Sequence, residues 1–193
     1  LAASELNGDA IKSAPVQFCD DFDIVMAAVR RKGAVLEHVL GYCSTALRQD
    51  RRIMLAAVAH HGVLAILPDE FKADRAIVWA AVSRFGGSSV RHAAASLRAD
   101  REFMREVVTQ GGGDPLRYAS EALQADRDFV LHCVRANPSN VQHASDALRD
   151  DFEVMMASLE VADGERTSLG TFKERSNGGT FEFATPALRS NPA

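Results

Sequence analysis

Residues 97–108 read Leu97-Arg-Ala-Asp100-Arg-Glu-Phe-Met-Arg-Glu-Val-Val108, and this pattern decides the fold. A large apolar residue, two variable positions and an aspartate recur six times, with spacings of 29, 24, 26, 26 and 25 residues between successive aspartates. The six aspartates are Asp21, Asp50, Asp74, Asp100, Asp126 and Asp151. Such regular repetition indicates that the chain is built from tandem copies of one structural unit.

Each aspartate is followed by the pattern of an amphipathic helix. Apolar residues stand three, four, seven and eight positions later, as Phe103, Met104, Val107 and Val108 do after Asp100. These offsets form one stripe along a helix. We therefore predict that each aspartate is an N-cap, whose carboxylate accepts hydrogen bonds from the free N–H groups of the first turn. Glycine or proline twelve positions after the first five aspartates ends each helix.

The segment before each aspartate predicts a second, shorter helix. Its apolar residues lie ten, seven and three positions before the aspartate, as Leu116, Ala119 and Leu123 do before Asp126. Two short helices cannot bury their stripes alone, so neighbouring units must stack. The predicted fold is all-α: an α-solenoid of about six helix-turn-helix repeats over residues 10–160, preceded by an N-terminal tail at residues 1–9.

Residues 161–193 leave the repeat pattern and form a predicted C-terminal arm. Asn177-Gly178 lies between Phe172 and the pair Phe181 and Phe183, which is typical of a small β-hairpin, and a disordered tail is the alternative. Because disordered tails are usually poor in aromatic residues, the three phenylalanines favour an arm that docks on the repeats or on a partner.

Composition excludes several classes of protein. The chain has 193 residues, 22 basic and 26 acidic, so a duplex-DNA binder or a basic membrane-surface protein is not the default. Three cysteines, an odd number, favour a reducing intracellular compartment over a disulfide framework. No apolar stretch predicts a transmembrane span. The chain begins at Leu1, so we expect that an upstream segment was removed or is not included, and one hypothesis is a peripheral location in a plastid or mitochondrion.

The unit resembles a known repeat. Leu-x-x-Asp-[Arg]-x-[Ile/Phe]-[Val/Met]-x-x-[Ala/Val]-Val, followed by glycine and a Tyr/His-Ala-Ser-x-x-Leu half, is similar to the domain-of-unknown-function family numbered four-one-one-six. Segments 97–108 and 118–134 match best, whereas residues 64–68, Leu-Ala-Ile-Leu-Pro, depart from Tyr-Ala-Ser and predict a distorted short helix. The resemblance implies a helical repeat common in algae and other protists, with an interaction role and no catalytic residues.

Four arginines directly follow a repeat aspartate, and stacking would place them in a ladder: Arg51, Arg75, Arg101 and Arg127. One hypothesis is an anionic partner, bound by guanidinium groups spaced one repeat apart. The other, which we favour, is pairing with carboxylates of the neighbouring unit, Glu102 and Asp128 among them. Nucleic acid is an unlikely partner, because residues 18–160 carry 17 basic and 20 acidic side chains.

The remaining polar residues predict no catalytic residue, no metal site and no cofactor. His92 and His143 occupy the position that holds Tyr42 and Tyr118 in other units, which indicates packing. No His-Glu-x-x-His or Cys-x-x-Cys motif is present. Cys43 and Cys133 fall on core positions, and Cys19 is expected to be more exposed. Trp79 is expected to pack between units, and would be the best contact residue if it were exposed.

The expected function is therefore a non-catalytic scaffold or accessory subunit that makes protein–protein contacts in a larger assembly. A peripheral subunit of an organellar membrane complex is one version of it. The alternative is binding of nucleic acid or another anionic ligand through the arginine ladder.

Overall fold

The computed structural model describes residues 16–31, 36–62 and 64–159 of the chain. Within these ranges every regular element is a helix and none is a strand, so the predicted all-α helical repeat fold is confirmed. The predictions for residues 1–9 and 161–193, including the three phenylalanines of the arm, lie outside the described residues. No helix within the described part has both the length and the apolar character needed to cross a membrane.

The chain divides into two compact units, the first comprising residues 1–85 and 92–94 and the second residues 86–91 and 95–193. The helices of the first unit are α1 (Val16–Cys19), α2 (Phe22–Arg30), α3 (Leu36–Tyr42), α4 (Thr45–Arg48), α5 (Arg51–His61), η3 (Leu64–Ile66), α6 (Asp69–Lys72) and α7 (Arg75–Phe85). The 3-10 helix η4 (Gly87–His92) crosses the boundary between the units. Those of the second unit are α8 (Ala95–Ala99), α9 (Arg101–Gly111), η5 (Pro115–Tyr118), α10 (Glu121–Gln124), α11 (Arg127–Ala136), η6 (Pro138–His143), α12 (Asp146–Arg149) and a helix over residues 152–159.

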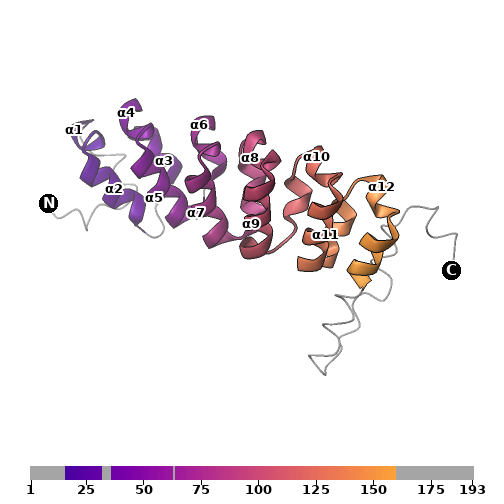
Figure 1. Ribbon diagram of the computed structural model, residues 1–193. Coiled ribbons are helices and arrows are strands. Elements are labelled where there is room, and N and C mark those ends of the chain that lie inside the picture. The colour runs from indigo at the N-terminus through magenta and orange to yellow at the C-terminus, as the bar shows by residue number, and fades with distance from the viewer. Residues whose placement is uncertain (1–15, 32–35, 63, 160–193) are drawn as a thin grey trace, which may run out of the picture. The chain divides into compact units, whose positions relative to one another are not determined.

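Within each unit, successive repeats lie side by side (Figure 1). In the first, the long helix α5 packs against α2 and α7; in the second, α11 packs against α9. The predicted apolar stripes form these contacts: Phe103, Met104 and Val107 are fully buried, and Val108 is 4% exposed. The repeat cores are thus made by the offsets read from the sequence.

The short half of the repeat differs from the prediction of one helix. In the later repeats it consists of a 3-10 helix followed by a separate one-turn α-helix, as in η5 and α10. Ala119 and Ser120 between them have extended backbones, and the Ser120 hydroxyl accepts a hydrogen bond from the N–H of Leu123. Because serine competes for backbone hydrogen bonds and prefers the N-cap, it interrupts the helix at this position.

A backbone hydrogen bond joins consecutive repeats at this break. The N–H of the residue that precedes the one-turn helix donates to the carbonyl two residues before the preceding repeat's aspartate. In the first unit Ala94 donates to Lys72 over 2.8 Å. In the second, Ser120 donates to Arg98 over 3.0 Å and Ser145 to Gln124 over 2.9 Å. This bond fixes the register of one short half on the next.

Cys19 differs from the expectation that it is exposed. It is 6% exposed, close to the 4% of Cys43, while Cys133 is fully buried. None of the three cysteines forms a disulfide within the part of the chain that the structure describes. Cys19 stands at the end of α1, and α1 packs on α2, so its side chain joins the core of the first repeat.

Candidate contact surface

The repeat aspartates cap the long helices. Asp21 accepts from the N–H groups of Asp23 and Ile24, and Asp100 accepts from that of Phe103 over 3.0 Å. Asp50, Asp74, Asp126 and Asp151 make equivalent bonds within their own helices. These carboxylates satisfy first-turn N–H groups that have no partner inside the helix. Capping accounts for the recurrence of the aspartate at this position.

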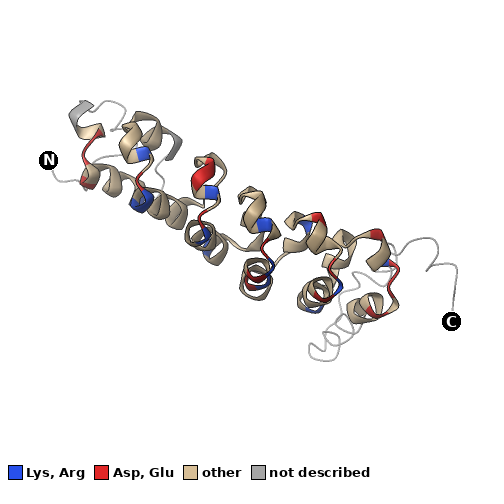
Figure 2. Ribbon diagram, turned by 45° about the horizontal axis from the view of Figure 1, so that its top comes forward, with Lys and Arg blue, Asp and Glu red and all other residues tan. Residues whose placement is uncertain are grey.

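Three of the ladder arginines bind the cap of the following repeat. Arg51 reaches Asp74 through two nitrogens, at 2.5 and 3.0 Å. Arg101 bonds to Asp126 at 3.1 Å and lies 3.8 Å from Asp128. In the same way Arg127 contacts Asp151 at 2.9 Å and Glu153 at 2.6 Å. The charged groups lie where each long helix begins (Figure 2).

The fourth ladder residue, Arg75, is also engaged in an interaction. The guanidinium groups of Arg51, Arg101 and Arg127 are therefore paired with this chain's own carboxylates, which favours the neighbouring-carboxylate hypothesis over an anionic ligand. Asp128, which the sequence suggested as a partner, lies near Arg101. The hydrogen bonds of the three arginines, however, go mainly to the N-cap aspartates of the following repeats.

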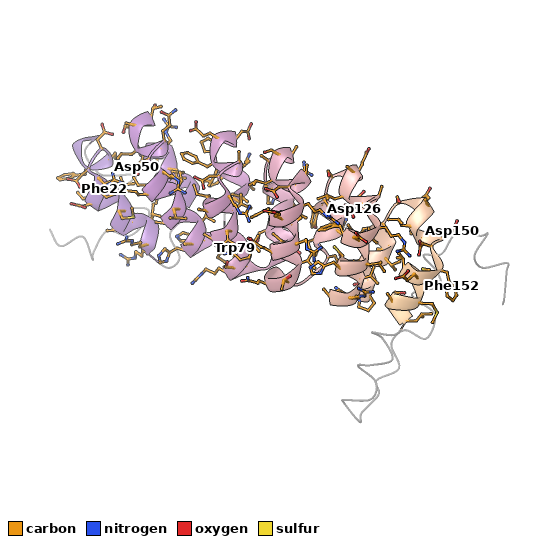
Figure 3. All side chains as sticks on the ribbon, in the orientation of Figure 1. Phe22, Asp50, Trp79, Asp126, Asp150 and Phe152 are labelled. Atoms are coloured by element: carbon orange, nitrogen blue, oxygen red, sulfur yellow. The ribbon has the colours of Figure 1, made fainter. Side chains whose placement is uncertain are left out.

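The first junction is built differently. Phe22 stands where the next four repeats have arginine. The Asp50 carboxylate accepts a hydrogen bond of 2.7 Å from Arg52 of its own helix. The Arg52 guanidinium lies 4.2 Å from the centre of the Phe22 ring, and Figure 3 shows Phe22 near Asp50. A cation–π contact thus replaces the arginine–cap pair at this junction.

The ion pairs hold the carboxylates in their charged form. Hydrogen bonding from Arg51 lowers the pKa of Asp74 below its ordinary value of 3.8, and Arg127 does the same to the pKa of Asp151. Arg52 likewise lowers the pKa of Asp50. A carboxylate with a lowered pKa is a poor proton donor near neutral pH, so these groups are suited to electrostatic contact and not to acid catalysis.

The cysteines and histidines take packing positions. Burial raises the pKa of Cys43 to about 11 and that of Cys133 to about 12, so neither thiol is a ready nucleophile. Burial also lowers the pKa of His132 and His143, which favours their neutral forms. Among the residues that the structure describes, no three His, Cys, Asp or Glu side chains gather as a metal site would require.

Trp79 does not meet the condition set for a contact residue. It is partly buried and engaged in an interaction. Ser83, one turn later in α7, donates its hydroxyl hydrogen bond to the Trp79 carbonyl at 2.8 Å. The side chain lies on a long helix (Figure 3), and the exposed large apolar residues are found elsewhere.

Exposed apolar side chains recur at one repeat position in the first unit. Tyr42 and Ile66 both stand eight residues before their repeat aspartates, and they are 44% and 39% exposed. The equivalent Tyr118 and His143 of the second unit are partly buried. The sequence predicts that side chains at this position pack against the protein, but in the first unit Tyr42 and Ile66 are exposed to solvent.

A cavity of about 320 Å³ opens beside this position. It is lined by Leu40, Gly41, Arg48, Met54, Ile66 and Pro68. We call it the repeat pocket. Its walls come from two consecutive repeats of the first unit, and its lining is mostly apolar, as in sites that take an apolar side chain.

The departure at residues 64–68 accounts for the repeat pocket. Pro68 occupies the position of Ala94, Ser120 and Ser145, and it has no N–H to donate to the carbonyl of Arg48. The register bond found at later junctions is thus absent between these two repeats. Gly41 leaves further space, because a Cβ added there would meet no atom within 4 Å. The sequence contains this departure from the repeat, but predicts only a distorted short helix from it. The 3-10 helix η3 is indeed shorter, with three residues where η5 has four.

Comparison with known proteins agrees with the repeat. Residues 74–124 and 126–163 match the family model described as Domain of unknown function (DUF4116). No curated protein and no solved structure matches the chain. The matched segments contain the helices α7 to α12 and the Arg101 and Arg127 pairs. These matches confirm the resemblance to that family, inferred from the repeat motif, over residues 74–124 and 126–163.

Proposed function

We propose that this protein is a non-catalytic scaffold or accessory subunit that binds a protein partner through the repeat pocket. The observation that carries the proposal is the break in repeat register at Pro68, which leaves an apolar cavity of about 320 Å³ between two repeats. Ile66 lines the pocket and is 39% exposed, so the cavity is continuous with an accessible apolar edge. A partner's apolar side chain in the pocket would be desolvated, as the central contacts of protein interfaces are.

Arg48 defines the kind of partner segment that fits. Among the described residues that line the repeat pocket, it is the one that carries a charge. A guanidinium at the edge of an apolar cavity suits a carboxylate or a backbone carbonyl next to the buried side chain. The expected ligand is therefore a peptide segment with a large apolar residue beside an acidic one.

The test is purification of the endogenous assembly in mild detergent, with tagged variants expressed in the same cells. Gly41→Leu fills the repeat pocket, and its helical position tolerates leucine well. The matched control is Ala65→Leu, which adds bulk at an exposed neighbouring position that does not line the pocket. Native sizing and mass spectrometry then report the partners.

We expect the unmodified protein and Ala65→Leu to migrate with the same large complex, and Gly41→Leu to migrate as a free species. Migration of the unmodified protein as a free species rejects the accessory subunit. Equal capture by Gly41→Leu rejects the pocket as the binding site. A peripheral subunit of an organellar membrane complex is one form of this proposal, and sizing from isolated organelles tests it.

A further inference from the structure

The last described repeat exposes two large apolar side chains on one side of its long helix. Phe152 is 70% exposed and Met156 is 37% exposed. They stand one and five residues after Asp151, on one side of the helix over residues 152–159. Figure 3 shows Phe152 at this end of the second unit.

The same two positions face the following repeat elsewhere in the chain. Arg127, one residue after Asp126, bonds to Asp151 of the next repeat, and Leu131, five residues after Asp126, is 6% exposed. In the first unit Phe22 contacts Arg52, and Met26 is 8% exposed. The face made by Phe152 and Met156 is therefore a repeat interface, and it lacks its neighbour in the part of the chain that the structure describes.

A sequence near the C-terminus has the pattern of that neighbour. Residues 177–191 read Asn-Gly-Gly-Thr-Phe-Glu-Phe-Ala-Thr-Pro-Ala-Leu-Arg-Ser-Asn, and residues 137–151 read Asn-Pro-Ser-Asn-Val-Gln-His-Ala-Ser-Asp-Ala-Leu-Arg-Asp-Asp. Five of the fifteen aligned positions are identical. Thr185 replaces Ser145 and Asn191 replaces Asp151, each a conservative exchange between N-cap residues.

The apolar positions agree as well. Phe181, Ala184 and Leu188 precede Asn191 by ten, seven and three residues, the offsets of the buried side chains in the short halves of the third to sixth repeats. In the fifth repeat these positions hold Leu116, Ala119 and Leu123, which are 0%, 7% and 6% exposed. The segment 177–191 therefore carries the core of a short half, displaced along the chain: Asn191 follows Asp151 by 40 residues, where the other spacings are 24 to 29.

The charges change together at this junction. Where arginine follows the aspartate and its pair is described, the next cap is an aspartate that accepts from it, as with Arg127 and Asp151. Here Phe152 replaces the arginine and Asn191 replaces the aspartate. Both side chains are uncharged, so the loss of the ion pair leaves no unpaired charge at this junction. The first junction offers the precedent, since Phe22 also lies opposite a cap, Asp50, that pairs with an arginine of its own helix, Arg52.

We infer that residues 177–191 dock on the Phe152 and Met156 face as the short half of a seventh repeat. In the docked form the Thr185 N–H donates to the Arg149 carbonyl, as Ser145 donates to Gln124. Phe181 and Leu188 enter the core, and Phe183 takes the edge position of Tyr42 and Ile66. Residues 160–176 form the connection, and a chain of that length reaches on the order of 50 Å.

Hydrogen–deuterium exchange of the full chain tests this docking, with mass spectrometry resolving peptides of the C-terminal region. We expect residues 181–190 to exchange about tenfold or more slowly than residues 165–176. Leu188→Asp should abolish that protection and also speed exchange in residues 152–158. Phe172→Asp is the matched control: it places the same charge on an aromatic position that has no counterpart in the repeat, and should change neither peptide.

Three outcomes would overturn the inference. The first is equal exchange of residues 181–190 and 165–176 in the unmodified chain. The second is release by Phe172→Asp but not by Leu188→Asp. The third is protection of residues 152–158 that grows with protein concentration alongside a doubled mass, because a second copy would then cover the face.

Discussion

At the scale of single residues, the repeat aspartate links local and long-range structure. Asp74 accepts hydrogen bonds from the N–H groups of Ala76 and Ile77, and the same carboxylate receives two nitrogens of Arg51 from the preceding repeat. The cap is a local requirement of the helix, whereas the ion pair joins two repeats. Because the pair is largely exposed, the cap is expected to supply most of the stability.

Substitutions at Asp74 separate the two contributions. Asp74→Ala removes the cap and the ion pair, and we expect it to lower the free energy of unfolding by about 0.5–2 kcal/mol. Asp74→Asn keeps an oxygen that caps the helix and loses only the charge, so its effect should be less than half as large. Urea unfolding of the purified protein at neutral pH measures both. Equal losses in the two variants would show that the ion pair, and not the cap, carries the stability.

The sequence was informative about these residues because they recur. Six aspartates at one position predict six caps, and the arginine after four of them predicted a ladder with neighbouring carboxylates as partners. The repeat pocket could not be predicted in the same way. The pocket forms because Pro68 has no N–H to donate and Gly41 has no side chain. Both are features of a single repeat, whereas a periodic pattern predicts only the features that the repeats share.

At the scale of elements, glycine sets how closely successive short halves approach. A Cβ added to Gly87 would overlap the carbonyl oxygen of Gly112 in the next repeat. A backbone atom cannot rotate away as a side chain can, so the two segments would have to separate. The sequence predicted the neighbouring Gly86 and Gly112 only as helix stops. The pattern of residues along the chain does not reveal which backbone segments pack against each other.

We therefore expect Gly87→Ala to destabilise the protein by about 1–3 kcal/mol, as overpacking does. Gly41→Ala is its control, since the added methyl group meets no atom within 4 Å. In the helix α3 it should be neutral or stabilising by up to ~1 kcal/mol. Thermal unfolding followed by circular dichroism compares the two, and a Gly87→Ala variant as stable as the unmodified protein would contradict the close approach.

Pro68 offers the complementary change. Pro68→Ser restores an N–H able to bond to the Arg48 carbonyl and supplies a hydroxyl cap for α6, which has no side-chain cap. A net backbone hydrogen bond is worth about 0.5–1.5 kcal/mol, and the loss of proline costs about 0.4–1 kcal/mol through the unfolded state. With the cap added, we expect a gain of about 1 kcal/mol in unfolding free energy.

The same Pro68→Ser substitution should weaken partner capture, because the restored bond draws the walls of the repeat pocket together. Urea unfolding and co-purification measure the two effects on one protein. Greater stability with unchanged capture would show that the register break has no part in binding.

At the scale of the molecule, the periodicity of the sequence predicted the helical repeat fold, but it did not predict that the short half of the repeat consists of two helices. Offsets of three, four, seven and eight predicted the long helices and their buried faces. The short half was predicted as one helix, because its apolar offsets fit a helix throughout. The structure divides it into two helices, and at Ser120 the hydroxyl accepts a hydrogen bond from the N–H of Leu123, a side-chain contact that apolar periodicity does not register.

Titration of the whole molecule should show two separate losses of stability as the pH falls. The pKa values of His132 and His143 are lowered by burial, and those of Asp50, Asp74 and Asp151 by hydrogen bonding to arginine. In both groups the folded state binds fewer protons than the unfolded state, so stability rises with pH. The histidine contribution is complete above their ordinary pKa of 6.5 and is lost below it. The aspartate contribution is complete above 3.8 and is lost below it.

We therefore expect the urea midpoint to fall first between about pH 7 and pH 5, and again below about pH 4. His132→Gln should reduce the first decrease and leave the second, whereas Asp74→Asn should reduce the second and leave the first. The physical reason is that each variant removes one group whose proton affinity differs between the folded and unfolded states. A single decrease confined to pH below 4 in the unmodified protein would show that the partly buried histidines take up protons without cost to the fold, against the packing role that their positions indicate.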